Sequence, residues 1–490
     1  MKIKIDAGKW FDEHEKELRD DLRALVRIPS ISVKTDDPKM PYGKACKEVL
    51  DACLALGARM GFMPYNHENY CGTVLWKGEI PEEIGFFGHA DVVPAGEGWS
   101  YEPFEMTELP DGILVGRGVS DNKGSFLTAL YALRCLKENG YKPKHSMRFF
   151  FGCSEETTME DLEYYAAHYP QPAFSLIADY RFPGTYGEKG LLEVDAECQK
   201  ASEVLRNFSA GVMSNAVPAH AEAVIFIKEH AKEITERLKK LGAEVMPLET
   251  EMTADEMQEK AENRQEMQNE GRMLRVSADG IPAHAAFPEG SESAEVKLAD
   301  ILLRSEVLDE GGRKLMEAVT HFFRDYYGAG LNIAYEDKES GKLTYVGGVA
   351  SYRDGIFRQN INIRYSVTAD RSDLVERLTK EMKLHGFTVT GVRGSNPCYV
   401  DPSLPPIQKL AEIANRILGT DLKPIVIGGG TYARKLKNAI AYGMGMPVRR
   451  MPFGKTRGGA HQADEYAEIG DFRKAFIIYI EAIQALDEMI

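Results

Sequence analysis

The sequence lacks any long uninterrupted run of apolar residues. Its 490 residues are 43% hydrophobic and 28% charged, an ordinary composition for a globular chain of two or three domains. No stretch approaches the roughly 20 apolar residues that a membrane-spanning helix needs. Residues 1–6 contain neither the apolar core nor the small-residue cleavage site of a signal peptide. The sequence therefore predicts a cytoplasmic protein that does not associate with membranes.

The sequence also has no excess of basic residues and no paired cysteines. Its 60 Lys and Arg face 75 Asp and Glu, and the net charge of −15 argues against nucleic acid as a partner. The seven cysteines are scattered and form no Cys-x-x-Cys pair, which predicts reduced thiols rather than a disulfide framework. Cys153 lies near two acidic residues, and we interpret it as a small buried core residue.

Helix-like and strand-like segments alternate in the first part of the chain. The spacing of apolar residues predicts three helices, at 10–27, 45–60 and 125–138. Three short apolar runs predict strands, at 84–87, 147–151 and 174–178. This alternation is typical of an α/β domain with a largely parallel sheet that is buried on both faces.

The composition changes after about Gly190. Residues 228–271 are rich in Glu, Lys, Met and Gln, which predicts solvated helices. Residues 273–277 and 360–367 alternate in polarity as antiparallel strands do. These features indicate an inserted α+β domain at 190–395, within the usual size of one domain.

From about Asn396 the first composition returns, and a helix is predicted at 472–486. We therefore expect an α/β catalytic domain in two parts, 1–189 and 396–490, interrupted by the insert. No repeat of the solenoid or propeller kind is evident.

Each of the three predicted strands in the first part ends in polar residues that can bind metal. The first is followed by Gly88-His89-Ala90-Asp91, the second by Glu155-Glu156, and the third by Asp179. Ligands bind at the carboxyl ends of strands in open α/β sheets, so we expect these side chains to share one crevice.

Two glycine-rich segments add further candidates. Gly116–Gly124 is a turn that leads into a predicted helix, with Asp121 at its tip, and His461 follows Gly458-Gly459-Ala460. Taken singly, a loop histidine, a helix-capping aspartate or an acid pair in a first helical turn is unremarkable. Their coincidence with strand ends favours a metal site.

The residue types narrow the choice of metal. Imidazole and carboxylate ligands without thiolate suit zinc, manganese or cobalt. Two histidines and several carboxylates are too many for one ion and suit two ions that share a bridging carboxylate. In an extended segment Asp91 lies on the same side as His89, so it can hydrogen-bond the far nitrogen of that ring. Of the pair Glu155-Glu156, one carboxylate can bind metal while the other faces a bridging water.

These motifs resemble metallopeptidase family 20, which contains acetylornithine deacetylase, succinyl-diaminopimelate desuccinylase, aminoacylase and bacterial dipeptidases. The resemblance rests on Gly88–Pro94, Gly116–Gly124, the Glu-Glu pair and the later Asp179 and His461. Within the family, the length, the large insert and Gly428–Arg434 are most similar to the dipeptidase V type. Asn122 departs from the pattern, because relatives often carry Asp or Met after the bridging residue.

The resemblance implies a role for each residue of the metal site. Asp121 would bridge two ions, and a cis peptide bond would follow it. His89 and Asp179 would complete one ion's site, and Glu156 and His461 the other. Two further residues would act beside the ions, with Glu155 as general base and Asp91 orienting His89.

The resemblance also implies that the insert acts as a lid. Asn215 and His284 would stabilise the developing oxyanion, and Arg364 would hold the substrate's terminal carboxylate together with Gly429, Gly430 and Arg434. Asn215 can equally make a simple turn, and Arg364 can be an exposed strand residue. For Arg434, the glycines of its loop can do the binding instead, through their backbone.

The activity implied is hydrolysis of short unblocked peptides by a monomeric enzyme. An N-acyl-amino-acid deacylase of the same fold is the alternative, because the chemistry at the amide carbon is identical. A catalytically dead carrier of metal or peptide is a third possibility, but binding alone does not need the base Glu155.

Overall fold

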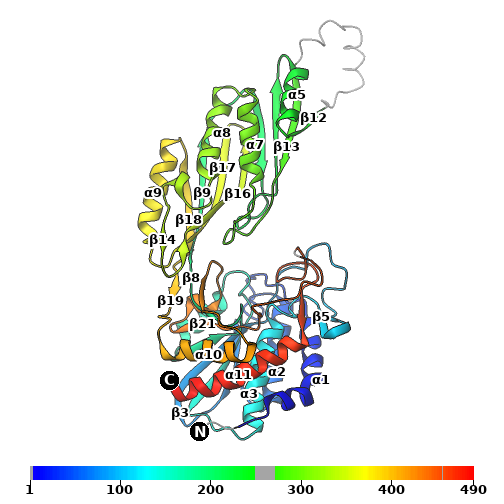
Figure 1. The fold of residues 1–490 in the computed structure, drawn as a ribbon, viewed down its shortest axis with the longest axis vertical. Coiled ribbons are helices and arrows are strands. Elements are labelled where there is room, and N and C mark those ends of the chain that lie inside the picture. Colours follow the sequence, from blue (N-terminus) through cyan, green and yellow to red (C-terminus); the bar gives the residue numbers. More distant parts are fainter. Residues whose placement is uncertain (1–3, 249–270, 455) are drawn as a thin grey trace. The chain divides into compact units, whose positions relative to one another are not determined.

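The computed structural model describes residues 4–248, 271–454 and 456–490. The chain divides into two compact units (Figure 1). Unit 1 comprises Met1–Glu188 and Cys398–Ile490, and unit 2 comprises Lys189–Pro397. Within the described residues, no helix combines the length and apolar character needed to span a bilayer. The role of unit 2 as a lid stays a prediction.

A six-stranded mixed sheet forms the centre of unit 1. Its strands are, in spatial order, β1 (Met63–His67), β2 (Cys71–Trp76), β6 (His145–Gly152), β3 (Ile80–His89), β7 (Phe174–Ile177) and β21 (Ala439–Ala441). From β6 to β21 the pairing is parallel, as predicted, whereas β1 and β2 are antiparallel. The difference arises because β1 and β2 form a hairpin: Glu68 and Asn69 in the tight connection have φ of 51° and 65°.

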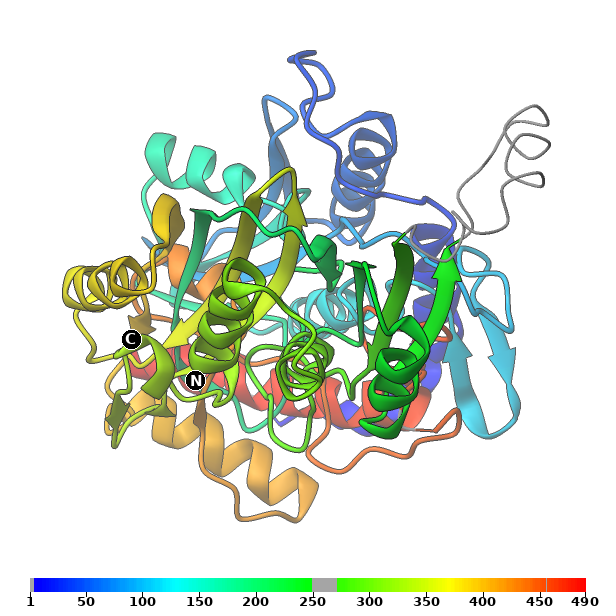
Figure 2. The same cartoon turned by 90° about the horizontal axis from the view of Figure 1, so that it is seen from above.

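Helices cover the sheet of unit 1. They are α1 (Ala7–Val26), α2 (Lys44–Arg59), α3 (Lys123–Glu138), α4 (Glu160–His168), α10 (Pro405–Leu418) and α11 (Ile469–Met489). α11 packs against α1, α3 and α10, and Figure 2 shows it in red beside the blue α1. α3 is buried on nearly every side, and Phe126, Leu127 and Leu130 join the core beneath the sheet. The second part of the chain is thus built into the core of the first.

Two small sheets complete unit 1. One contains β19 (Cys398–Tyr399), β8 (Thr185–Glu188) and β20 (Ile425–Ile427), and the other β22 (Tyr466–Glu468), β5 (Ile113–Val115) and β4 (Thr107–Leu109). In both, strands from before and after unit 2 in the sequence pair with each other. These pairings tie the two parts of unit 1 together.

Unit 2 contains an eight-stranded antiparallel sheet. In spatial order its strands are β12 (Glu244–Leu248), β13 (Arg272–Asp279), β11 (His220–Ile227), β10 (Leu205–Ala210), β16 (Thr344–Arg353), β17 (Ile356–Tyr365), β9 (Gly190–Gln199) and β18 (Thr388–Ser395). Four helices share one core with it: α5 (Ala231–Lys240), α7 (Ala294–Arg304), α8 (Glu310–Phe323) and α9 (Arg371–Leu384). A two-stranded sheet, β14 (Glu336–Asp337) and β15 (Gly341–Lys342), lies between α8 and β16 in the sequence.

The polar segment 228–271 is only partly helical. α5 is the expected solvated helix, with Leu238 as its buried residue. Glu244–Leu248, however, forms β12, which pairs with β13 at the edge of the sheet. β12 pairs on one side alone and none of its five side chains is fully buried, so the polar composition of the surrounding segment did not indicate it. Residues 249–270 lie outside the described residues.

Candidate metal centre

The predicted ligands after the three strands lie at one edge of the parallel sheet. β3 has β6 and β7 as its two neighbours, and His89, its last residue, is in register with Gly152 at the end of β6. Phe87 of β3 is likewise in register with Ile177, the last residue of β7. The chain places Glu155 and Asp179 just beyond these ends, so sheet register brings distant sequence positions together.

Asp121 lies between two imidazole rings. Its Oδ1 is 3.2 Å from Nε2 of His89, and its Oδ2 is 3.2 Å from Nε2 of His461. The residue stands just before α3, and the peptide bond Asp121–Asn122 is cis, which confirms that prediction. Each oxygen of one carboxylate therefore faces a different histidine, as a residue that bridges two ions must do.

Asp121 belongs to two groups of three potential metal ligands. In one group its partners are His89 and Asp179, and in the other they are Glu156 and His461. Within each group the candidate ligand atoms all lie within 4.8 Å of one another. Nε2 of His461 is 3.0 Å from Oε2 of Glu156. The five predicted ligands thus divide into the same two sets that the resemblance implies.

The donor set fits divalent metal ions. Nε2 of His89 is buried and has no hydrogen-bond partner among the described residues, although Asp121 lies close by. Oε1 of Glu155 is buried in the same way and also lacks a partner there. Buried polar groups are normally satisfied, so such orphaned atoms indicate that another species completes the site. Imidazole and carboxylate donors without thiolate suit zinc, manganese or cobalt.

The electrostatics of the cluster also require cations. Burial raises the pKa of Glu155, and the nearby charge of Asp179 adds to the effect. Burial and the charge of Asp121 raise the pKa of Asp179 to about 7. Hydrogen bonds to Asp121 and Glu156 raise the pKa of His461 to about 11. Carboxylates so crowded resist ionisation until positive charge balances them, and divalent metal ions can supply that charge.

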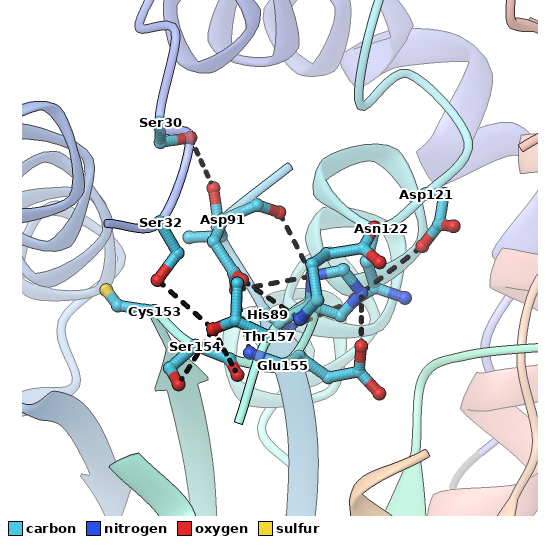
Figure 3. A network of polar contacts seen from close by, with 12 residues as sticks. Ser30, Ser32, His89, Asp91, Asp121, Asn122, Cys153, Ser154, Glu155 and Thr157 are labelled. Carbon is cyan, nitrogen blue, oxygen red and sulfur yellow. Dashed lines mark hydrogen bonds and ion pairs between the residues drawn. The ribbon is translucent and has the colours of Figure 1, made fainter. Parts of the chain in front are cut away.

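Glu155 occupies a different position from Glu156. Its Oε2 is 4.0 Å from Nε2 of His89 (Figure 3), and the side chain is 8% exposed. In the same view the imidazole of His89 lies between Asp121 and Glu155. Glu155 belongs to neither three-donor group. One acid of the pair is therefore available for proton transfer.

Asp91 contacts both His89 and the acid pair Glu155-Glu156. Nδ1 of His89 donates to the backbone carbonyl of Asp91 at 3.0 Å, whereas the Asp91 carboxylate is 3.5 Å away. That carboxylate accepts from the backbone N–H groups of Glu155, at 3.2 Å, and Glu156, at 3.1 Å. Asp91 therefore orients His89 mainly through its backbone and positions the acid pair through its side chain.

Sequence reasoning missed the residue that supports Asp121. Glu465 is fully buried, and it accepts from Nη1 of Arg117 at 2.8 Å and from the backbone N–H of Asp121 at 2.9 Å. It also accepts from the backbone N–H groups of Gly118 and Ser120. Glu465 thus joins the glycine-rich turn to the loop that carries His461. The sequence signal that could have identified Glu465 is its position four residues after His461.

Asn122 and Asp161 support the strand ends. Oδ1 of Asn122 accepts from the backbone N–H of His89 at 3.2 Å, and its Nδ2 donates to the carbonyl of Ala178 at 2.6 Å. Buried Asp161 accepts from the backbone N–H groups of Cys153 and Ser154. Asn122, which departs from the family pattern, therefore has a structural role. Cys153 is fully buried, as predicted.

The glycine-rich loop near Arg434 is held by a buried ion pair. Nε of Arg434 lies 3.0 Å from Oε2 of Glu188, and its Nη2 donates to the carbonyl of Gly429 at 3.0 Å. A Cβ on Gly430 would lie 2.1 Å from Nη2 of Arg434, so a larger residue there would displace the guanidinium from its ion pair with Glu188. Arg434 therefore shapes this loop, and its role in binding substrate stays a prediction.

Two of the predicted lid residues are adjacent in unit 2. The N–H of Ala285, next to His284, donates to the carbonyl of Asn215 at 2.9 Å, and Ala216 forms a β-bridge with His284. His284 is exposed, and its Nδ1 accepts from the backbone N–H of Ala286.

The third predicted lid residue joins the same region through a hydrogen-bonded chain. Arg364 is 7% exposed, not an exposed strand residue, and its Nε donates to Asn362 at 2.9 Å. Asn362 donates to Glu193, which also accepts from Ser214. Ser214 precedes Asn215, so unit 2 gathers all three residues into one connected region. Their approach to the metal cluster stays a prediction.

A cavity of about 330 Å³ in unit 1 opens onto the cluster. Asp121 and Asp179 contribute to its lining, together with Arg181, Met444 and Asp471. The cavity therefore offers carboxylate, guanidinium and thioether groups beside the candidate ligands.

Comparison with known proteins places these features in a family. Residues 85–485 match peptidase family M20/M25/M40. "Putative dipeptidase YtjP" of Bacillus subtilis (strain 168) is 31% identical over 481 residues, covering 96% of this chain and 97% of that protein. The "Beta-Ala-Xaa dipeptidase" of Lactobacillus delbrueckii subsp. lactis is 30% identical over 475 residues, covering 95% of each.

Solved structures agree on the fold. Human carnosine dipeptidase 1 matches with a TM-score of 0.55 at 14% identity, and 98% of each chain is covered. The dipeptidase Dug1p of Saccharomyces cerevisiae matches with a TM-score of 0.54 at 15% identity, again over 98% of each chain. With the family match across most of the chain, the protein is a member of peptidase family M20/M25/M40, a metallopeptidase that hydrolyses peptide bonds.

Proposed function

We propose that this protein is a dipeptidase that uses two divalent metal ions, with zinc as the native metal and manganese or cobalt able to replace it. The observation that carries the proposal is Asp121, whose two oxygens face two different imidazoles. Full-length similarity to a protein named as a β-Ala-Xaa dipeptidase supports the choice of substrate.

His89, Asp121 and Asp179 would hold one ion, and Asp121, Glu156 and His461 the other. When bound, the ions supply Lewis acidity at the scissile carbonyl and lower the pKa of the attacking water. Every other role falls to side chains of this chain.

Glu155 is the proposed general base. It accepts the proton of the attacking water and then donates that proton to the departing amine. Its unpartnered buried Oε1 and its raised pKa support this role, because a base works best when its pKa approaches the working pH. Asn215 and His284 are proposed to stabilise the oxyanion.

The substrate we infer is a short peptide with free ends. The cavity beside the cluster, about 330 Å³, has both a carboxylate, Asp471, and a guanidinium, Arg181, in its lining. An unblocked dipeptide carries one charge of each sign, so both groups have a counterpart. Arg364, Gly429, Gly430 and Arg434 are the further residues proposed to hold the terminal carboxylate. We also infer a cytoplasmic, monomeric enzyme.

A substrate panel tests the proposal. The purified protein is given an α-dipeptide, a β-alanyl dipeptide, a tripeptide and the N-acetyl form of the dipeptide's second residue. We expect the dipeptides to have kcat/KM values at least about 100-fold above the acetylated compound. The acetyl group replaces the first residue of the dipeptide and lacks the ammonium group that this residue carries. Fast cleavage of the acetylated compound alone would instead identify a deacylase.

Removal of metal separates catalysis from simple binding. Dialysis against a chelator should abolish cleavage of every substrate, and addition of zinc, manganese or cobalt should restore it. A protein that retains full activity after its metal content falls to zero would refute the metal-dependent mechanism.

A further inference from the structure

We propose that His321, Glu381 and His385 of unit 2 form a binding site for a divalent cation of the zinc or nickel class. None of these residues belongs to the metal centre of unit 1. His321 lies in the last turn of α8, Glu381 in the last turn of α9, and His385 caps the end of α9. Their candidate ligand atoms all lie within 4.8 Å of one another.

One carboxylate oxygen faces both imidazoles. Oε1 of Glu381 is 3.3 Å from Nε2 of His321 and 3.6 Å from Nε2 of His385. The two rings are stacked, with centroids 4.5 Å apart and planes inclined by 24°. Both ring nitrogens that face the carboxylate are therefore on the same side of the stack. The ligand atoms of His321, Glu381 and His385 therefore lie around one common position.

The donor types select the cation. Two imidazoles and one carboxylate suit zinc, nickel, cobalt or copper, whereas calcium and magnesium prefer oxygen ligands alone. Three protein ligands leave at least one position for water, as in many zinc sites. The side chains of His321 and His385 are 45% and 32% exposed, so an ion can enter directly from solvent.

The helix ends favour positive charge at this place. α8 ends at Phe323 and α9 at Leu384, so the site lies at two helix C-termini. The partial negative charge of a helix C-terminus stabilises a nearby cation. Two such ends converge here on ligands that include a carboxylate.

The site rests on a rigid base. Phe322 is 1% exposed, and its ring lies against His385, with centroids 5.1 Å apart, and against Phe387. Gly386, with φ of +83°, allows the chain to turn directly after His385. The ligands are therefore held by packed residues, and an ion bound to them would join the ends of α8 and α9.

Equilibrium dialysis of the full-length protein against Zn²⁺ tests the proposal. The His321→Phe variant keeps an aromatic ring to stack on His385 but loses the ligand nitrogen. His220→Phe is the matched control, because His220 is also exposed and lies 2.7 Å from a carboxylate, that of Asp279, without a second imidazole. We expect His321→Phe and His385→Phe to bind about one ion fewer per chain than wild type and the control.

The count is a difference between variants, so it does not depend on how many ions unit 1 binds. Zn²⁺ should also raise the melting temperature of wild type more than that of His321→Phe, because ligands stabilise the state that binds them. Equal binding by all four proteins would overturn the proposal and leave the cluster as an ion pair. Loss of binding in His220→Phe as well would overturn it too.

Discussion

At the scale of single residues, the metal centre is a buried excess of negative charge. Asp91 is fully buried, Glu155 nearly so, and Asp121, Glu156 and Asp179 complete the set. Burial of charge is costly unless it is paired. A bound cation would lower this cost by pairing with the carboxylates of the two three-donor groups, to which Glu155 does not belong.

Glu155→Gln should separate metal binding from catalysis. The amide cannot accept a proton, so we expect turnover to fall by about 10²–10⁴-fold. Because Glu155 belongs to neither three-donor group, metal content measured by mass spectrometry should not change. Glu48→Gln, at an exposed position of α2, serves as control. A near wild-type rate in Glu155→Gln would refute the assignment of Glu155 as the general base.

Glu465→Gln should weaken metal binding from outside the ligand set. The amide keeps the size of the side chain but loses the charge that pairs with Arg117 and one of the two oxygens that accept from the backbone of the Asp121 turn. Residues that orient ligands typically contribute 10–100-fold in affinity, so we expect about that loss in a chelator competition.

The same competition with Glu481→Gln, at an exposed pair with Arg416, should leave affinity unchanged. Circular dichroism distinguishes a loosened turn from general unfolding. Unchanged affinity in a folded Glu465→Gln protein would contradict the positioning role.

At the scale of elements, α7 meets its sheet through a buried acid. Glu295 is fully buried, and burial raises its pKa to about 8. A Cβ on Gly347 of β16 would lie 2.8 Å from both Glu295 Oε2 and Gln359 Nε2, so these side chains would have to shift for a larger residue. α7 itself packs mainly against β11 and β13, and the carboxyl group that it places beside Gly347 is neutral at neutral pH.

This acid should make unit 2 less stable as pH rises. Between the unfolded pKa near 4.5 and the folded value of about 8, the folded state holds a proton that the unfolded state has lost. The free energy of unfolding then falls with pH across that window, by at most about 1.4 kcal/mol per unit. Glu295→Gln stays neutral throughout, so its melting temperature relative to wild type should be higher at pH 8 than at pH 5.

The exposed Glu317→Gln on α8 should show no such change between the two pH values. A difference between Glu295→Gln and wild type that is the same at pH 5 and pH 8 would show that the carboxyl ionises without penalty.

The elements that the sequence predicted best are the ones with strong apolar periodicity. The parallel strands β3, β6 and β7 and the helix α3 lie where apolar runs indicated. β12 was not predicted, because it is an edge strand inside a polar segment and its pairing with β13 involves residues distant in the sequence.

For the site, too, features specified by local sequence could be predicted, and features specified by distant contacts could not. The candidate ligands could be predicted from local signals, because His89, Asp121 and His461 lie in glycine-containing motifs and Glu156 and Asp179 follow apolar strands. Glu465 could not, because its function lies in contacts with residues 344 to 348 positions away. The contact of the Asp91 carboxylate with the acid pair was not predicted for a related reason: Glu155 and Glu156 follow a different strand.

At the scale of the whole molecule, the question is whether one chain carries all the groups needed for catalysis. Unit 2 gathers Asn215, His284 and Arg364 into one connected region. A unit as large as a domain has room for the whole lid function.

We therefore expect His284→Ala to lower turnover by about 10²–10³-fold while metal content stays unchanged. A mixture of Glu155→Gln and His284→Ala proteins should then remain inactive, because each chain lacks one group. Wild type mixed with Glu155→Gln, at activity proportional to its fraction, is the control. Activity regained in the mixture of variants would prove that His284 acts across subunits.

The position of His461 sets an order for making the enzyme. The ligands His89 to Asp179 precede unit 2 in the chain, whereas His461 and Glu465 follow it. α11, which packs against α1 and α3, also follows. During synthesis the first part of unit 1 therefore lacks His461, Glu465 and α11 while all of unit 2 is made. We expect the nascent chain to be inactive as a hydrolase until this last segment has left the ribosome.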